Sequence, residues 1–186
     1  MKALLPTTLN VCGTEYEINA DFRTVLHIFS AFRDDDLTLE EKALVCMQCL
    51  YRQPESIPME HLEEAIRQAY WFCDGGDIPK SKAEPVKTMD WQQDAHMLFP
   101  AVNKVAGFEI RDCPFLHWWT FLGLFCEIGD GLFATVLHIR QKRAHSKPLE
   151  KWEQEFYSRN AALIDLISEE QQAEIDETMA FLETIT

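Results

Sequence analysis

Helical periodicity runs through most of this chain and restricts its folding more than any other feature. From residue 22 onward, apolar residues recur every three or four positions, beginning with Phe22, Val25, Leu26 and Phe29. This spacing places apolar side chains on one face of a helix. Comparable stripes continue towards the end of the chain. The sequence therefore predicts a mainly α protein, an irregular multi-helix bundle of about eight helices.

The first twenty residues follow a period of two instead. Leu9 and Val11 alternate with polar residues before Gly13, and the alternation resumes after it. A glycine in the first position of a two-residue turn fits a type II′ β-hairpin. We therefore expect a small N-terminal β-hairpin over residues 8–19, with Gly13 and Thr14 as its turn.

The length of 186 residues suits a single domain that can bury a sizeable core. Within it we expect a helical core over residues 21–167. An acidic C-terminal helix is expected over residues 168–186 and can lie at the periphery, because its apolar stripe is narrow.

Several residues predict where helices begin and end. Asn19 or Asp21 is placed to cap the first helix, and Thr38 with Glu41 fits a capping box for the second. Pro100 interrupts another stripe, so we expect that helix to kink or to split.

Other residues predict where the third helix ends and where a later helix begins. Gly75-Gly76 should stop the third helix. Ser146 and Pro148 should start a long amphipathic helix that continues to residue 167.

The charge balance narrows the choice of partners. The chain has 17 basic and 31 acidic residues, a net charge of −14, which repels phosphate backbones and argues against nucleic acid as a partner. A basic stretch from Arg140 to Lys151 stands against this trend. It could contact an acidic surface or nucleic acid, but the charge balance favours pairing with the acidic tail of this chain.

The most apolar segment is FLHWWTFLGLFC, residues 115–126, which carries no charge. A membrane-spanning helix needs about 20 apolar residues, so this segment is too short and no membrane partner is expected. The N-terminus has no signal-peptide pattern, so the six cysteines are expected to be reduced thiols.

Catalytic motifs are absent from the sequence. The phosphate-binding patterns GxGxxG and GxxxxGK[ST] do not occur, and neither does the GxSxG nucleophile motif. Cys46 and Cys49 form a CxxC, but a second pair of ligands is missing, so packing thiols are favoured over zinc. We expect no catalytic residue, no cofactor and no metal, and hence a protein that is not an enzyme.

Three other groups of residues resemble catalytic or metal-binding groups but have plainer structural interpretations. Cys113 and His117 share a helix face, yet a hydrogen-bonded core histidine is favoured over a metal ligand. The run of residues 34–36 is all aspartate and fits a solvated turn better than a cation site. Asp90 and Asp94 are expected at an exposed helix start, where acids are favourable.

Trp118 and Trp119 raise the question of a binding surface. Adjacent helical residues point about 100° apart, so either the helix is buried nearly all round or one ring reaches the surface. An exposed tryptophan is typical of a binding hot spot. The candidate partner-binding residues are His117, Trp118, Trp119, Phe121, Arg140, Trp152 and Phe156.

Taken in order, several segments resemble one family. They are LNVCGTEYEINADFR, AYWFCDGG, DWQQDAHMLF, LHWWTFLGLFCEIGDGLF and VLHIRQKRAHSKPLEKWEQEFY. Together they are similar to the bacteriophage Gp-fifteen family of long-tailed phages and prophages of Gram-positive hosts. Cys12 departs from the pattern, because it stands where the hairpin turn usually has Asp or Asn. The tail after Ser168 has no counterpart that matches.

The resemblance implies a place in the tail module, next to the major tail protein and the tape-measure protein. By that position the family is similar to tail assembly chaperones, which bind these proteins in the host cytoplasm and are absent from the mature virion. We therefore expect a non-enzymatic tail assembly chaperone whose partners are the tape-measure protein, the major tail protein or both. Self-association into a homo-oligomer is compatible with this role.

Two alternatives from other functional classes stay open. One is an acidic mimic of DNA that inhibits a host protein, which the basic stretch from Arg140 to Lys151 argues against. The other is a metal-dependent enzyme built on Cys113 and His117, which metal analysis of the purified protein would test.

Overall fold

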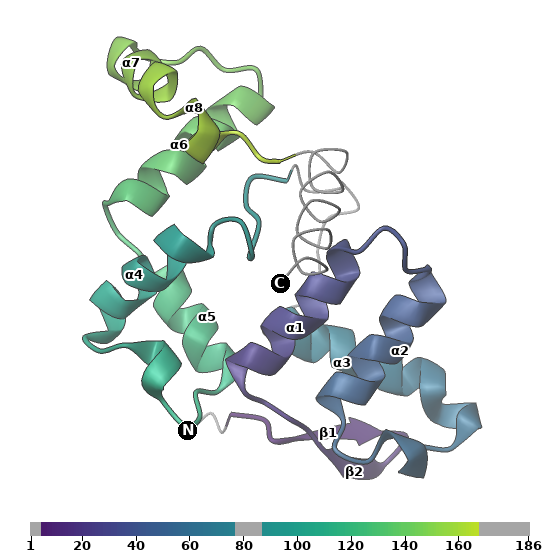
Figure 1. Cartoon of the computed structure of the whole chain (residues 1–186). Helices are drawn as coiled ribbons and strands as arrows, with labels where there is room; N and C mark the ends of the chain where they lie inside the picture. The colour runs from purple at the N-terminus through teal and green to yellow at the C-terminus, as the bar shows by residue number, and fades with distance from the viewer. Residues whose placement is uncertain (1–4, 77–86, 168–186) are drawn as a thin grey trace, which may run out of the picture. The chain divides into compact units, whose positions relative to one another are not determined.

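The computed structural model describes residues 5–76 and 87–167 (Figure 1). These residues fall into two compact units. Unit 1 comprises residues 5–76 and 98–129 of the described part, and unit 2 comprises residues 87–97 and 130–167. The single domain expected from the sequence stays a prediction. The acidic helix expected over residues 168–186 lies outside the described residues.

The described part of the chain contains eight α-helices and one two-stranded antiparallel sheet, which confirms the mainly α fold with an N-terminal hairpin. Unit 1 holds β1 (Thr8–Val11), β2 (Thr14–Glu17), α1 (Phe22–Arg33), α2 (Leu39–Leu50), α3 (Leu62–Cys73) and α5 (Trp118–Cys126), with three short 3-10 turns. Unit 2 holds α6 (Leu132–Ala144), α7 (Lys151–Arg159) and α8 (Ala161–Ile164). The division between the units falls within α4 (Ala95–Ala106).

The hairpin forms where it was expected, but its turn is different. Val11 pairs with Thr14, so the two turn residues are Cys12 and Gly13 rather than Gly13 and Thr14. Both have positive φ, 50° and 90°, which is the geometry of a type I′ turn. The predicted type II′ turn at Gly13 and Thr14 was therefore wrong. Thr14 pairs with Val11 and belongs to β2, so it cannot be a turn residue.

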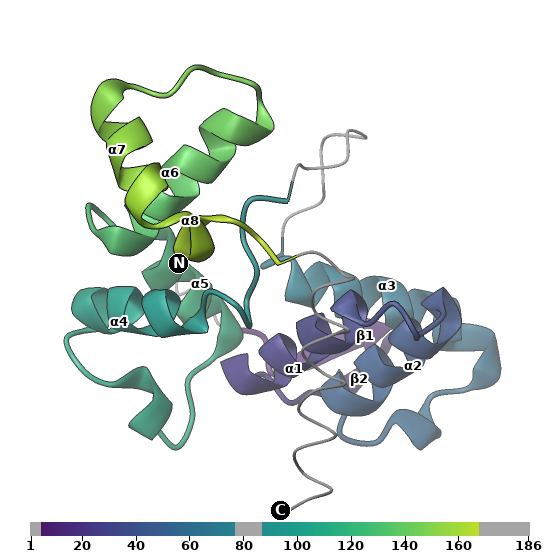
Figure 2. The same ribbon diagram turned by 45° about the horizontal axis from the view of Figure 1, so that its top comes forward.

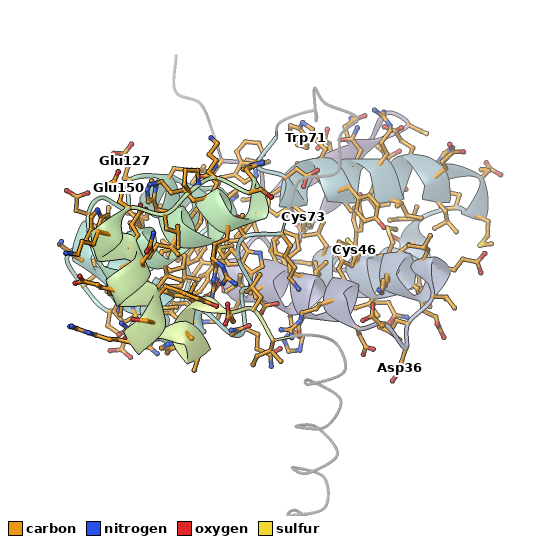
Figure 3. All side chains as sticks on the ribbon, turned by 90° about the horizontal axis from the view of Figure 1, so that it is seen from above. Asp36, Cys46, Trp71, Cys73, Glu127 and Glu150 are labelled. Carbon is orange, nitrogen blue, oxygen red and sulfur yellow. The ribbon has the colours of Figure 1, made fainter. Side chains whose placement is uncertain are left out.

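The predicted starts of the first two helices are confirmed. Asp21 is the cap of α1, and its Oδ1 accepts a hydrogen bond of 2.9 Å from the Arg23 amide. Thr38 and Glu41 form the expected capping box of α2. The run of residues 34–36 lies exposed in the turn between these helices, where Figure 3 shows Asp36.

The end of α3 is fixed by glycines, as the sequence predicted. Gly75 and Gly76 have φ of 77° and 85°, and the Gly76 amide bonds to the Trp71 carbonyl at 2.9 Å. A Cβ atom on Gly76 would lie 2.8 Å from the ring of Trp119. Glycine is therefore required here both to end the helix and to let α5 approach.

Of the two outcomes expected at Pro100, a kink or a split, the split does not occur. α4 continues through this residue from Ala95 to Ala106. Proline removes the bond from residue 100 to the carbonyl of residue 96, and both residues are exposed, so the freed carbonyl can be hydrated.

The long helix predicted from residue 148 to residue 167 is two helices. Ser146 is not a helix start: its φ of 52° ends α6, and the next amide bonds back to the Lys142 carbonyl at 2.8 Å. α7 starts only at Lys151 and breaks at Asn160, before α8 (Figure 2). The break turns α8 back against α6, which a continuous helix could not do.

Candidate partner-binding site

The start of α5 is fixed by its histidine. His117 is the N-cap, and its Nδ1 accepts a hydrogen bond of 3.0 Å from the Trp119 amide. Its Nε2 lies 2.9 Å from the Pro6 carbonyl, so Nε2 must carry the proton and donate it. His117 is buried and uses both ring nitrogens within the protein. This geometry is that of a hydrogen-bonded core histidine.

Trp118 lies in the core of unit 1. Its side chain is 1% exposed, its indole Nε1 donates to the Cys73 carbonyl at 2.8 Å, and its ring stacks on Phe121. Phe121 is fully buried and stacks in turn on Phe22, with ring centroids 4.9 Å apart. Trp118 and Phe121 therefore present no surface to a partner in this structure.

Trp119 points in a different direction and is only half-buried. Its Nε1 donates to the Phe72 carbonyl at 3.0 Å, and its ring lies 5.3 Å from the ring of Trp71. Of the two alternatives for the tryptophan pair, the structure places one ring in the core and the other at the edge. The exposed part of Trp119 is apolar, because its only polar atom is already paired.

Phe115 is an exposed aromatic residue that sequence reasoning missed. It precedes α5 and is 55% exposed. The segment that carries it is held by hydrogen bonds: Arg23 donates to the carbonyls of Arg111 at 2.9 Å and of Cys113 at 2.6 Å. The Leu116 amide donates to Asp21 at 3.0 Å. Phe115 lies outside α5, which begins only at Trp118.

Arg140, which was expected at a basic surface, is buried in unit 2. Its guanidinium forms two hydrogen bonds to the Asp94 carboxylate, at 2.7 and 2.9 Å, and its Nε donates to the Ile164 carbonyl at 2.6 Å. Asp94 has no exposed surface and Asp90 is also buried. The expectation of an exposed acidic helix start was therefore wrong, because Arg140 supplies the charge that lets Asp94 be buried.

A second charged group in the interior of unit 2 is Glu153. It accepts hydrogen bonds from Lys142 at 2.6 Å and from His138 at 3.0 Å, and it has no exposed surface. Burial raises the pKa of Glu153, but hydrogen bonds from Lys142, the Glu150 amide and His138 outweigh burial, so the pKa lies below its ordinary value. The ammonium group of Lys142, like the guanidinium of Arg140, is thus paired with a carboxylate within the protein.

The remaining candidates of unit 2 lie on α7. Trp152 is 51% exposed, and its Nε1 donates to Glu150 at 2.9 Å. Phe156 is half-buried. The seven candidates are thus divided between the two units, and only Trp119, Trp152 and Phe156 present part of their side chains to solvent. Whether they bind a partner stays a prediction.

Two of the six cysteines are buried packing residues, whereas Cys12 and Cys126 are exposed. Cys46 and Cys73 are buried between α2 and α3 (Figure 3). A hydrogen bond with Cys46, together with burial, raises the pKa of the Cys73 thiol well above its usual range. No group of three or more His, Cys, Asp or Glu residues within residues 5–76 and 87–167 is arranged to hold a metal ion.

The described residues form a helical protein in which several large apolar side chains are exposed, among them Phe115 and Trp152. Residues 1–166 match the family described as Bacteriophage Gp15 protein, and the chain belongs to that family. No curated protein matches the chain. No solved structure matches it either. Among the helices described here, none is long and apolar enough to cross a membrane.

Proposed function

We propose that this chain is a tail assembly chaperone, which binds the tape-measure protein, the major tail protein or both while a phage tail is built. Membership of the Bacteriophage Gp15 protein family carries the proposal. The resemblance of the motifs to this family implies a place in the tail module and so supports the proposal. On this proposal the protein acts by binding, without catalysis, in the host cytoplasm, and is absent from the mature virion.

Physical features of the chain support this role. A chaperone must offer apolar contacts and still keep its complex with an apolar client in solution. Phe115 and Trp152 are each more than half exposed, and the net charge of −14 opposes aggregation. A helical client would be recognised through its apolar face.

Co-expression with the tape-measure protein of the same phage tests the proposal. The soluble fraction is analysed by size-exclusion chromatography with light scattering. We expect the tape-measure protein to become soluble and to elute with this chain in a defined stoichiometry. If it stays insoluble while this chain elutes alone, the same experiment is repeated with the major tail protein. Failure with both clients would contradict the chaperone role.

A further inference from the structure

Four aromatic rings of unit 1 form a continuous row, which we call the aromatic strip: Phe115, His117, Trp119 and Trp71. Successive ring centroids lie 6.5, 6.2 and 5.3 Å apart. His117 is buried, Trp119 and Trp71 are half-buried, and Phe115 is exposed. The strip begins before α5 and ends near the C-terminal end of α3, where Figure 3 shows Trp71.

The aromatic strip is held in place by the backbone around it. Arg23 and Asp21 fix the segment of Phe115 through hydrogen bonds, and His117 joins α5 to Pro6. At the other end, Gly76 leaves no room for a side chain against the rings of Trp119 and Trp71. Binding to rings that are already ordered costs little conformational entropy. Other exposed apolar residues of unit 1, such as Leu39 and Met59, belong to no ring cluster in the described structure.

The charge of unit 1 indicates what such a surface would attract. Its described residues include 16 acidic and 7 basic side chains, a net charge of −9. Asp74 lies two residues before Gly76 and forms no ion pair with a described residue. The Asp74 side chain is exposed, and partial desolvation raises the pKa of its carboxylate. A cationic group placed there would form an ion pair with this carboxylate.

We propose that the aromatic strip with Asp74 is the docking surface for a cationic amphipathic helix of a partner protein. The apolar face of that helix covers Phe115 and Trp119, and a Lys or Arg at its edge pairs with Asp74. The inference rests on the proposed function, since it names the surface that receives the client and the chemistry of the client segment.

The first test uses a defined peptide with the full chain. The probe is a dye-labelled amphipathic helix of about 18 residues made of Leu and Lys, long enough for five turns. Its binding is followed by fluorescence anisotropy. The comparison peptides replace Lys by Glu, or Leu by Gln. We expect binding of the Leu/Lys peptide alone. Equal binding of the Gln/Lys peptide, which keeps the positive charge but lacks the apolar face, would mean that charge alone is recognised and would overturn the proposal.

Two surface variants locate the peptide on the protein. Phe115→Ser should weaken binding about tenfold, the effect of removing one aromatic anchor. Asp74→Asn should weaken it about threefold, as for one partly exposed ion pair. Leu39→Ser and Met59→Ser are the controls, because they remove even more exposed apolar side chains outside the strip and should leave affinity unchanged. Equal losses in all four variants, or no loss in the first two, would place the site elsewhere.

The same variants separate this inference from the chaperone role. If the wild-type chain keeps the tape-measure protein in solution and Phe115→Ser and Asp74→Asn do so equally well, the chaperone role stands and the docking surface is wrong. If the wild-type chain binds the peptide at the strip but neither tail protein, the surface stands and the proposed function is wrong. Circular dichroism spectra of all variants confirm that each one is folded.

Discussion

The described interior of unit 1 consists of aliphatic, aromatic and sulfur-containing side chains with one histidine, whereas unit 2 also buries charged groups. In unit 1 the large buried side chains include Trp118, Phe22, Phe72 and Phe121. Unit 2 encloses the ion pair of Arg140 with Asp94, and it encloses Glu153. The surfaces differ accordingly. The described residues of unit 1 carry 16 acidic and 7 basic side chains, while those of unit 2 carry 7 of each.

The two interiors are stabilised by different kinds of interaction. Aromatic packing depends on buried area and on contacts that are individually small, so its free energy is distributed over many neighbours. A buried ion pair is directional, and losing one partner leaves the other charge without compensation. Unit 2 therefore uses much of its positive charge internally, and the acidity of unit 1 stays at the surface where a partner can reach it.

The largest expected effect tests the interior of unit 1. Trp118→Ala should lower the free energy of unfolding by about 4 kcal/mol, because it leaves a large cavity. Trp152→Ala in unit 2 is the matched control and should change it by less than about 0.5 kcal/mol, since Trp152 is half exposed. Urea denaturation measures both. A similar loss in the two variants would contradict the burial of Trp118.

A smaller effect is expected when the ion pair of unit 2 is broken. Asp94→Asn should cost about 3 kcal/mol, because the buried guanidinium of Arg140 loses its counter-charge. The double variant Asp94→Leu with Arg140→Met should recover most of this loss, to within about 1 kcal/mol of the wild type. A double-mutant cycle by urea denaturation measures the coupling. Additive losses would show that the two groups do not interact.

The pH dependence of unit 2 should depend on Glu153. The pKa of Glu153 lies below its ordinary value of 4.5 in the folded protein. Its contribution is therefore fully present above the unfolded pKa and is lost as the pH falls below about 4.5 through the folded pKa. Glu153→Gln should flatten the fall in stability in this range. Unfolding curves between pH 6 and pH 3, at about one-unit steps, measure the difference. An unchanged slope would contradict the assignment.

The smallest expected changes in the free energy of unfolding come from substitutions in two strained turns, one in each unit. Cys12 and Ser146 have positive φ without being glycine, which costs an L-residue about 1–2 kcal/mol. Cys12→Asn and Ser146→Gly should each raise the free energy of unfolding by about 0.5–1 kcal/mol, because both replacements accept this conformation more readily. Thermal unfolding measures the gain. Cys12→Val is the control and should be destabilising.

Local interactions explain why much of the fold was predictable. The Asp21 cap, the Thr38–Glu41 capping box and the Gly75-Gly76 stop depend on residues within a few positions of one another. The apolar stripe of α1 follows in the same way from its spacing. These features specified helices and their ends before any tertiary contact was known.

The candidate site was less predictable, because burial depends on distant partners. Arg140 and Asp94 are 46 positions apart, and nothing in the local sequence of either indicates that they pair. The direction of each tryptophan ring was also open: Trp118 found the Cys73 carbonyl and Trp119 the Phe72 carbonyl, both on α3. Phe115 was overlooked because its exposure results from the hydrogen bonds that Arg23 and Asp21 make with a segment far along the chain.

The sequence by itself determined the mainly α class, the hairpin, several helix ends and the family of this phage protein, since periodicity, caps and motifs are local properties. The tertiary structure alone decided which of the expected contact residues are interior, which acidic groups are buried with a cation, and which aromatic rings stay accessible. The physical reason is that burial and charge pairing depend on contacts between segments that the order of residues along the chain does not specify.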